Sequence, residues 1–524
     1  MPITNISIEN FKGIGKRVDI PIRPITLLFG ANSAGKSTIL QALLYLRHVL
    51  ENSEPSQVNV DKLEVSGETI DLGGFDQFVH NQDLNNKVHI AVTVSVDDDG
   101  LPISSAGLEK ISALTPLKDV NEVSVGVTIR ELGEWCCVEL YEVKINGEYI
   151  AKIQEIDSPE NCELAINILH PAFGGMPDND DEIHPLVSYW LGSDQVVENT
   201  MYMGSQPGSE LFCIPRMGSS FKDYFRGDSD DENFAEANYY LTQLLIGSCE
   251  LVHKELKGMR NIGGLREIPD RSYKPRLTQH SEKWYKGIAA WDRFHGDHYK
   301  IEPYLNALNR LGLDSRFEVR EFLELPKDGI VSSLAYKNKD EEISLDMEES
   351  DDVRRELKEA RFVQKLIITD EREEVELEPA DVGVGISQVL PVVVGAHDKK
   401  FTLLSIEQPE LHIHPAIQCN LADELVNALF LSDRTTIERE SDRVLLLETH
   451  SEHLMLRLLR RIRESYDGEL PPGVKGLSPE SISVVYVERN NQSVKITHLP
   501  VTEDGDFEKK WPKGFFEERT EELF

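Results

Sequence analysis

The chain has 524 residues, which is too long for one ordinary core, so we expect two or three packed units. Hydrophobic residues make up 40% and charged residues 28% of the chain, as in a globular protein. No apolar run approaches the roughly 18 residues of a membrane span, and the N-terminus has no secretory signal pattern, so we predict a cytoplasmic protein without membrane contact. The net charge of −37, from 55 Lys and Arg against 92 Asp and Glu, argues against a surface that coats nucleic acid everywhere, while a local basic patch stays compatible with it. The six cysteines contain no C-x-x-C pair, so neither a zinc module nor a disulfide framework is indicated.

The N-terminal part reads as strands, a glycine loop, a helix and a meander. Alternating apolar residues predict strands over 3–11 and 18–22, and a continuous apolar run predicts a buried strand over 25–29. A glycine loop follows, and apolar residues then recur at helical spacing from 39 to 46. From about 66 to 155 the period is two, with turn residues between the runs, which predicts an antiparallel β-meander. We therefore assign residues 1–155 to an N-terminal lobe.

The middle of the chain is less regular. Residues 156–337 are expected to form a mixed and helical insertion, with helices over 233–257 and 283–311 and no heptad pattern for a long coiled coil. Residues 338–378 are acidic, with a strand over 362–368 and a flexible loop near 341–352.

After this acidic segment, helices and short apolar strands alternate. Helices are predicted over 387–396, 415–430 and 452–464, and strands over 401–406 and 444–447. Such alternation is typical of a parallel α/β sheet, and we assign it to a C-terminal lobe, residues 379–470. Two more strands, 482–487 and 494–497, lie in a final unit of residues 471–524.

The glycine loop carries the strongest chemical signal. It satisfies G-x-x-x-x-G-K-[ST] between an apolar strand and a helix, which is the required context. Its glycines let backbone N–H groups face phosphate oxygens, Lys36 would bridge the β- and γ-phosphates, and the Ser37 hydroxyl would coordinate Mg²⁺. The predicted nucleotide-binding residues of the loop are Gly30, Asn32, Ser33, Gly35, Lys36, Ser37 and Thr38.

A P-loop also needs an acid at the end of a second buried strand to hold the magnesium. The strand over 401–406 runs into Glu407, which we predict as that second metal ligand beside Ser37. The chain then continues as Gln408-Pro409-Glu410-Leu411-His412-Ile413-His414-Pro415.

These segments resemble the ABC-type ATPases of the SMC, RecF and OLD group, in which many OLD-like members read close to I-E-x-P-E-L-H-L-H-P. The segment 10–13, Asn-Phe-Lys-Gly, resembles the opening of these ATPase heads, and His450 stands at the place of their switch histidine. Residues 382–388 occupy the signature position, as a loose version of the L-S-G-G-Q loop. The resemblance covers the first 80 residues and those after about 375. It implies an α/β P-loop ATPase head with a mixed or parallel sheet, a β-meander lobe and a helical insertion in place of a long coiled coil.

The resemblance also implies a mechanism. Two heads would dimerise around two ATP molecules, each held by the P-loop and Glu407 of one protomer and by the signature residues of the other. Those signature residues are Gly385, Ser387 and Gln388. His450 would sense the γ-phosphate or hold the attacking water.

One residue departs from the family pattern. Where most relatives place a second acid as the general base, this chain has Gln408, and an amide cannot accept a proton at neutral pH. Either Glu410 or Glu448 substitutes, or hydrolysis is slow; we favour slow turnover in which Glu407 and His450 assist. The predicted catalytic residues are Lys36, Glu407, Gln408, Glu410 and His450.

Several other signals allow two interpretations. His412 and His414 form either a metal pair or part of a loop at the dimer seam, and Gln77 or Gln82 is either a magnesium contact or part of a polar surface loop. Residues 254–300 hold 11 Lys or Arg against 6 Asp or Glu with interleaved aromatics, which suits either nucleic acid or a solvated structural face. A second basic cluster, equally ambiguous, comprises Arg457, Arg460, Arg461 and Arg463.

By resemblance, the chain groups with ATPase subunits of anti-phage systems such as Septu, PARIS and retron-associated ATPases. We find no convincing nuclease centre, which fits an ATPase that is a sensor and scaffold for a separate effector, a nuclease or toxin. The acidity of the chain suits a basic effector. The alternative is a RecF-like or SMC-like DNA repair or clamp ATPase.

Overall fold

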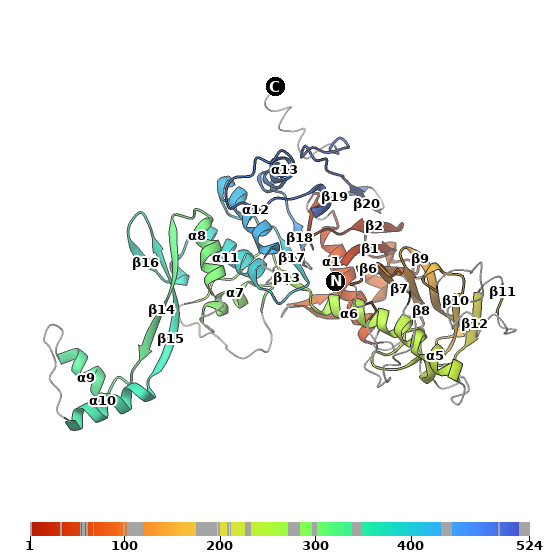
Figure 1. Cartoon of the computed structure of the whole chain (residues 1–524), viewed down its shortest axis with the longest axis horizontal. Coiled ribbons are helices and arrows are strands. Elements are labelled where there is room, and N and C mark those ends of the chain that lie inside the picture. The colour runs from red at the N-terminus through yellow and green to blue at the C-terminus, as the bar shows by residue number, and fades with distance from the viewer. Residues whose placement is uncertain are drawn as a thin grey trace.

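The computed structural model describes most of the chain. Described are residues 3–31, 34–52, 54, 58, 61–65, 68–97, 100–101, 117, 119–173, 196–197, 200–206, 209, 211–225, 232–270, 283–295, 301–337, 347–430, 443–490 and 493–512. Two large sheets lie side by side, and a narrow arm projects from the body on the side away from the antiparallel sheet (Figure 1).

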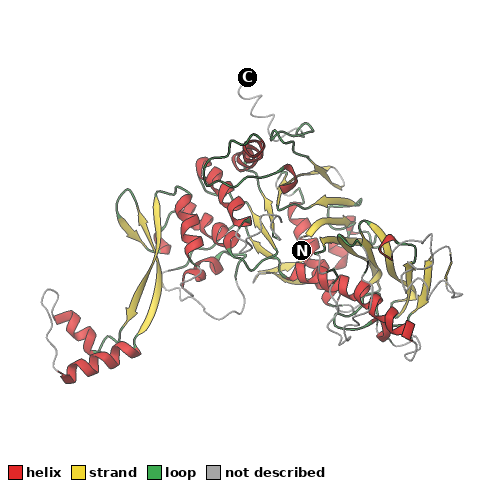
Figure 2. Ribbon diagram, in the orientation of Figure 1, coloured by secondary structure: helices red, strands yellow, loops and turns green. Residues whose placement is uncertain are grey.

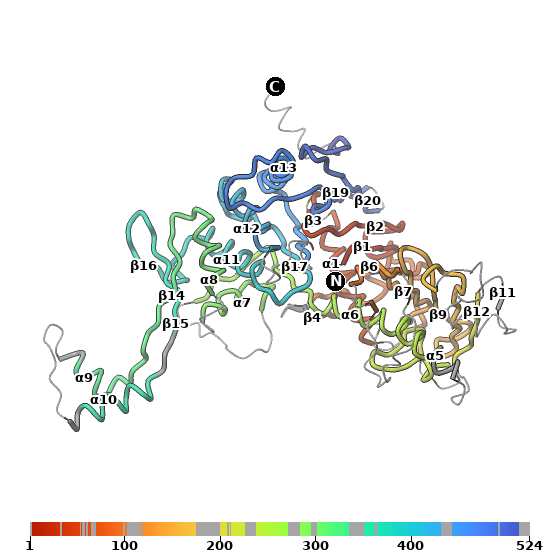
Figure 3. Tube along the Cα trace, in the orientation of Figure 1, coloured from red at the N-terminus to blue at the C-terminus, as the bar shows by residue number. Residues whose placement is uncertain are grey.

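The six-stranded sheet is built from both ends of the chain. Its order is β13 (Arg260–Ile262), β17 (Leu403–Glu407), β18 (Val444–Glu448), β3 (Ile25–Phe29), β19 (Ile482–Asn490) and β20 (Ser493–His498). All neighbours are parallel except β19 and β20. Figure 3 shows the first and last parts of the trace running together here. The central β3 is buried at every residue, which explains its continuous apolar run.

The two faces of this sheet pack against different helices. On β3, Leu28 belongs to the core that contains α1 (Lys36–Glu51), whereas Leu27 and Phe29 belong to a second core. That second core also receives the apolar faces of α11 (Val384–His397), α12 (Pro415–Leu429) and α13 (Glu452–Tyr466). The strand–helix alternation predicted from residue 387 onward is therefore confirmed.

The second sheet is antiparallel and has nine strands. Its order is β11 (Val196–Val197), β12 (Thr200–Gly204), β10 (Asn161–Asn167), β9 (Glu148–Ser158), β8 (Trp135–Ile145), β7 (Glu122–Leu132), β6 (Val88–Ser95), β1 (Ile3–Glu9) and β2 (Val18–Pro21). The meander thus exists but extends past its predicted end at residue 155. A helical run packs beside it, formed by α5 (Glu232–Leu241), a π-helical stretch (Thr242–Gly247) and α6 (Ser248–Lys257), as expected for 233–257.

The arm is a long hairpin of β14 (Ser315–Glu324) and β15 (Arg361–Asp370), with β16 (Val375–Leu377) beside β15. Figure 2 shows α9 (Ile330–Lys337) and α10 (Met347–Glu359) at its far end. The flexible loop predicted over 341–352 is wrong for residues 347–352, which begin α10; the rest lies outside the described residues. The charged residues of this segment are compatible with a helix, because Asp351 and Arg354 pair along α10 at 3.4 Å.

Two other expectations need correction. The helix predicted over 283–311 is two helices, α7 (Ile288–Asp292) and α8 (Glu302–Arg310), with residues 296–300 outside the described part. Within the predicted helical insertion, β13 instead forms the edge of the six-stranded sheet. A search of the described residues finds no helix with the length and apolar character needed to cross a membrane.

Candidate functional site

The P-loop lies where β3 ends and α1 begins. Gly30 has a φ of 146°, and a Cβ on it would lie 2.1 Å from the carbonyl oxygen of Val487. Gly35 caps α1 with a φ of 104°. Both positions therefore require glycine, as the motif predicts. Asn32 and Ser33 lie outside the described residues, so their predicted role stays a prediction.

Lys36 folds back over its own loop. Its Nζ donates to the carbonyl oxygens of Gly30 at 2.9 Å and Ala31 at 3.0 Å, and it lies 3.6 Å from Glu448 Oε1. Burial lowers the pKa of Lys36, and the neighbouring Glu448 opposes that shift. A buried ammonium that rests on carbonyl oxygens is available to bind phosphate oxygens in their place.

Two acids end adjacent parallel strands. Glu407 on β17 pairs in register with Glu448 on β18. Burial, followed by the charge of Glu448, raises the pKa of Glu407, and hydrogen bonds from Asn261 and the Gly264 backbone oppose the rise. Ser37 Oγ donates to Glu448 Oε2 at 3.1 Å. The acid that contacts Ser37 is thus Glu448, while the role of Glu407 as a metal ligand stays a prediction.

Glu410 and His450 meet beside these acids. Glu410 accepts hydrogen bonds from Thr449 Oγ1 at 2.8 Å and from the backbone N–H of His450 at 2.7 Å. Burial, and then the charge of Lys36, lowers the pKa of His450, which therefore favours the neutral imidazole. The structure brings Lys36, Glu410 and His450 together, as the sequence predicts.

Helix α11 contains the signature residues Gly385, Ser387 and Gln388 that were predicted to contact a second protomer. Two of the three are not exposed. Ser387 and Gln388 are buried; Ser387 Oγ donates to the Val384 carbonyl at 2.8 Å, and the Gln388 amide is bound to Arg266. Neither side chain is free to contact a second protomer. Gly383, the N-cap of α11, and Val384 are exposed, and Gly385 is half-buried, so only Gly385 of the predicted trio is accessible.

Arg266 is a site residue for which the sequence predicted no role. It is 4% exposed, and its guanidinium donates to the carbonyl oxygens of Glu407 at 2.5 Å and Gln408 at 3.2 Å. Gln408 has a left-handed φ of 44°, so Arg266 holds the chain where it turns sharply after β17. Burial lowers the pKa of Arg266 to about 10, which leaves it charged at neutral pH.

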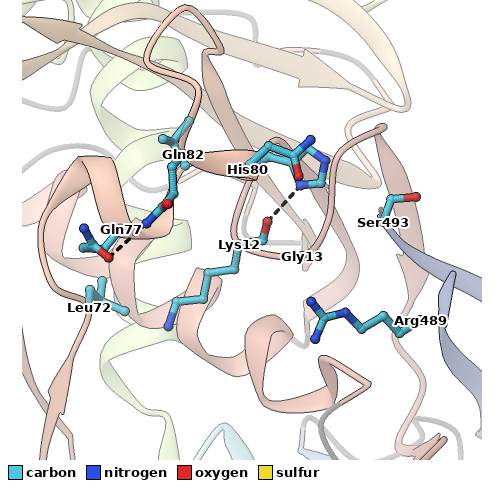
Figure 4. Close-up of a pocket in the computed structure, with 10 residues that line it drawn as sticks. Lys12, Gly13, Leu72, Gln77, His80, Gln82, Arg489 and Ser493 are labelled. Carbon is cyan, nitrogen blue, oxygen red and sulfur yellow. Dashed lines mark hydrogen bonds between the residues drawn. The ribbon is translucent and has the colours of Figure 1, made fainter. Parts of the chain in front are cut away.

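Figure 4 shows residues that line a cavity of about 440 Å³. This cavity lies beside the P-loop. Val494 joins the two, since a Cβ on Gly13 of the cavity or on Gly35 of the P-loop would lie 2.7 or 3.0 Å from Val494 Cγ2. Lys12, between β1 and β2, and Arg489, on β19, both line the cavity. The sequence did not predict that these two residues lie at one site. The cavity is lined by Lys12, Gly13, Leu72, Gln77, Val79, His80, Asn81, Gln82, Arg489 and Ser493.

The cavity wall is held in an uncommon backbone conformation. Lys12, Asn81 and Gln82 have left-handed φ values of 51°, 57° and 56°. His80 Nδ1 lies 2.9 Å from the Lys12 carbonyl oxygen, and Gln82 Nε2 donates to Gln77 Oε1 at 3.1 Å. Left-handed non-glycine residues cluster at functional sites. Gln77 and Gln82, for which the sequence left two interpretations open, both line this cavity.

The donor set at the P-loop fits a magnesium nucleotide. Mg²⁺ prefers oxygen ligands and binds with one or two carboxylates plus phosphates, which matches the Ser37 hydroxyl beside Glu448. Among the described residues no group of three or more His, Cys, Asp or Glu forms a separate metal site. His414 instead caps α12, since its Nδ1 accepts from Ala416 N at 3.3 Å.

For the part of 254–300 that the structure describes, the contacts of the aromatic residues and of two arginines support the structural interpretation of this basic segment. Trp284 and Trp291 are buried in the core, so they cannot stack on bases. Arg260 and Arg293 each pair with the buried Asp398 at 2.8 Å. Tyr273 and Tyr299 lie outside the described residues.

The second basic cluster is also largely engaged within the chain. Arg457 and Arg461 pair with Asp423 at 2.6 and 2.7 Å. Arg460 pairs with Glu464 at 2.6 Å. Cations engaged in this way serve the packing of α13 rather than an open basic surface.

Three family models match segments of this chain. Residues 1–182 match a family described as an AAA ATPase domain, and residues 260–456 match an AAA domain family named for the AbiEii toxin of Type IV TA systems. Residues 477–524 match a family of proteins of unknown function, DUF3696. No curated protein matches the chain.

Solved SMC heads also resemble the chain weakly. An SMC head bound to the C-winged helix domain of ScpA is 10% identical, with a TM-score of 0.39 over 95% of this chain and 98% of that one. The SMC head domain from Thermotoga maritima is 8% identical, with a TM-score of 0.37 over 96% and 100%. One from Pyrococcus furiosus, bound to the C-terminal domain of ScpA, is 13% identical, with a TM-score of 0.36 over 95% and 97%. TM-scores this low support no inference about this chain.

The fold and the site define the class of the protein. It is an α/β P-loop protein with a mixed sheet, a β-meander lobe and no long coiled coil among its described residues. More particularly, two segments of it match AAA ATPase domain families, and these matches imply nucleotide binding.

Proposed function

We propose that this protein binds and slowly hydrolyses ATP, and that its ATP-bound form dimerises as the sensor and scaffold for a separate effector in anti-phage defence. The observation that carries the proposal is the meeting of Lys36 and Ser37 with an acid at the carboxyl ends of parallel strands. Such an edge, beside a glycine loop and a helix N-terminus, is where phosphates bind. The bound Mg²⁺ would neutralise charge on the transferring phosphoryl group.

The nucleoside part of ATP is proposed to enter the cavity beside the P-loop. Its volume of about 440 Å³ lies within the usual range for small-molecule sites. Lys12 and Arg489 offer positive charge and hydrogen-bond donors to the ribose and base. The variant Arg489→Ala should weaken ATP binding while leaving α1 and the P-loop folded.

Slow turnover follows from the groups around the γ-phosphate position. Gln408 can orient water but cannot accept its proton, and both oxygens of Glu410 already accept hydrogen bonds. We propose that Glu407, assisted by His450, supplies the remaining acid–base function. A long-lived ATP state suits a protein that holds a complex together and releases it on hydrolysis.

The proposed dimer would use the exposed start of α11. Gly383 and Gly385 bring backbone N–H groups toward solvent at the positive end of a 14-residue helix, which favours a partner's γ-phosphate. Ser387 and Gln388 would support this turn from beneath rather than touch the nucleotide.

The effector partnership rests on two observations. The chain has a net charge of −37, which favours a basic protein partner. One AAA match is named for a toxin of a toxin–antitoxin system, which is a setting of the same kind.

Native mass spectrometry of the chain expressed with its genomic neighbours tests the proposal. A stoichiometric partner on an ATP-dependent multimer is expected for the wild type and not for Lys36→Ala. The matched control is Lys87→Ala, because Lys87 pairs with Glu139 on β8 of the antiparallel sheet and not with a P-loop residue. A partner-free protein, or a multimer indifferent to Lys36, would contradict the scaffold function.

A further inference from the structure

Two buried cysteines meet beside the antiparallel sheet. Cys162 lies on β10, and Cys213 lies in the segment 211–225, which comes after β12 in the chain. Their Sγ atoms are 2.9 Å apart, and both residues are buried. A disulfide has an S–S distance of about 2 Å, so a movement of about 1 Å would close the bond. The proposed ATP site uses neither residue.

The backbone at each of the two cysteines is fixed by the surrounding structure. The Cys162 N–H donates to Ser205 Oγ at 3.1 Å, and its carbonyl oxygen accepts from the Ser205 N–H at 2.8 Å. Phe212 and Cys213 have left-handed φ values of 40° and 63°, which is uncommon for residues other than glycine. Such a conformation persists only where the surrounding structure imposes it. The fold therefore holds the two thiols in contact.

The acidity of Cys162 differs from that of other buried cysteines in the chain. A hydrogen bond with the Cys213 thiol lowers the pKa of Cys162, although burial opposes the shift. By contrast, burial raises the pKa of Cys136 and of Cys249 to about 12, and that of Cys137 to about 11. The thiolate is the form of cysteine that reacts with oxidants. Cys162 is therefore the thiol of the pair that should react first.

We propose that Cys162 and Cys213 form a redox modification site, which a peroxide oxidises to a reversible disulfide. The Cys162 thiolate attacks one peroxide oxygen, the O–O bond breaks, and a sulfenic acid and a hydroxide ion form. The Cys213 sulfur then attacks the sulfenic sulfur, so that the S–S bond forms as the S–O bond breaks and a second hydroxide leaves. The two thiol protons convert both hydroxides to water. Hydrogen peroxide thus gains the two electrons that the thiols lose.

The disulfide would fasten the segment 211–225 to the antiparallel sheet. This segment already contacts the helical run beside the sheet, since the Phe221 N–H donates to Thr242 Oγ1 at 2.9 Å. A covalent link to Cys162 on β10 would therefore join the helical run to the sheet through one short segment. A disulfide that closes a long loop stabilises a protein by restricting its unfolded chain. Oxidation should accordingly raise the melting temperature by about 2 °C or more.

The test treats the full-length protein with hydrogen peroxide and identifies the linked cysteines by mass spectrometry after digestion without a reductant. We expect one cross-linked pair of peptides, which contain Cys162 and Cys213 and together weigh two hydrogen atoms less than the separate peptides. Dithiothreitol should restore the separate peptides and reverse the rise in melting temperature. Free thiols at both residues after peroxide treatment would overturn the proposal, and so would a cross-link from Cys162 to Cys137.

Single variants assign the stabilisation to this pair. Cys162→Ala and Cys213→Ala should each lose the rise in melting temperature on oxidation. The matched control is Cys419→Ala, which should keep the cross-link and the rise, because Cys419 lies on α12 and donates to the His453 carbonyl oxygen at 3.7 Å. If either variant of the pair fails to fold, the cross-link and the melting temperatures of oxidised and reduced wild type still decide. A rise that persists in a folded Cys213→Ala would contradict the assignment.

Discussion

Gln388 and Arg266 are joined by two reciprocal hydrogen bonds, and both residues are buried. Gln388 Nε2 donates to the Arg266 carbonyl at 2.8 Å, and the Arg266 N–H donates to Gln388 Oε1 at 3.2 Å. Since the Arg266 guanidinium also reaches the carbonyl of Glu407, the start of the signature helix is linked to the acidic end of β17. Any movement of α11 should therefore reach Glu407.

Replacing Arg266 by lysine should separate binding from turnover. Lysine cannot donate to three carbonyl oxygens at once in this planar arrangement, so the turn at Gln408 loses its support. We expect kcat for ATP to fall by about tenfold to a hundredfold with a small change in KM, as for a misplaced catalytic group. Steady-state ATPase assays measure both constants.

The matched control for this change is Arg310→Lys. Arg310 pairs with Glu424 at 2.6 Å, on α8, which packs against α11, α12 and β14. An equal fall in kcat for both variants would show that Arg266 acts on global stability alone.

Glu410→Ala should destabilise the segment that carries His450. The change removes the acceptor of two hydrogen bonds, from Thr449 Oγ1 and from the His450 N–H. We expect the free energy of unfolding to fall by about 2 kcal/mol, the usual range for bonds to a charged group. Urea denaturation measures it, and Glu410→Gln, which keeps one oxygen acceptor, should recover part of the loss. If alanine and glutamine behave alike, these hydrogen bonds do not support the segment.

Gly383→Ser should stabilise the protein. Gly383 caps α11 with φ −60° and ψ 151°, and a Cβ there meets no atom within 4 Å. Serine is a favourable N-cap residue, and it makes the unfolded chain less flexible than glycine does. The free energy of unfolding should therefore rise by about 0.5 to 1 kcal/mol. Gly385→Ser is the contrast, since its Cβ would lie 3.2 Å from the His412 carbonyl. Melting temperatures that fall for Gly383→Ser would contradict the capping geometry.

Acid should destabilise the antiparallel sheet through His89. Burial lowers the pKa of His89 to about 4; Glu142 and Asp19 oppose the shift, while the charges of Arg17 and Lys144 add to it. In the unfolded chain the pKa is near 6.5, so protons bind the unfolded state first. The contribution of neutral His89 to the free energy of unfolding is complete above about pH 6.5. It is lost, by up to about 3 kcal/mol, as the pH falls to about 4. The measurement is the pH dependence of urea unfolding in wild type and His89→Gln, whose curves should converge toward pH 4. Parallel curves would mean that His89 does not titrate in this window.

Local patterns predicted those parts of the protein whose structure depends on neighbouring residues in the chain. The P-loop followed from its glycines, because the left-handed backbone at Gly35 and the close approach of Val487 to Gly30 exclude other residues. Apolar residues at helical spacing predicted α12 and α13, and short apolar runs predicted β17 and β18. Each of these elements buries apolar side chains in the second core.

Long-range contacts decided what the periodicity could not. The sheet order places Glu448 between Glu407 and β3, and a residue at the end of one strand carries no sign of which neighbour it will face. The burial of Ser387 and Gln388 depends on where the segment around Arg266 crosses α11.

The sequence by itself therefore determined the class of chemistry, because a glycine loop, a lysine and a hydroxyl act through local backbone geometry. Only the tertiary structure decided which acid meets Ser37, which end of α11 is exposed, and that Lys12 and Arg489 share one cavity. These are contacts between residues more than a hundred positions apart, and their free energy comes from packing that no short segment contains.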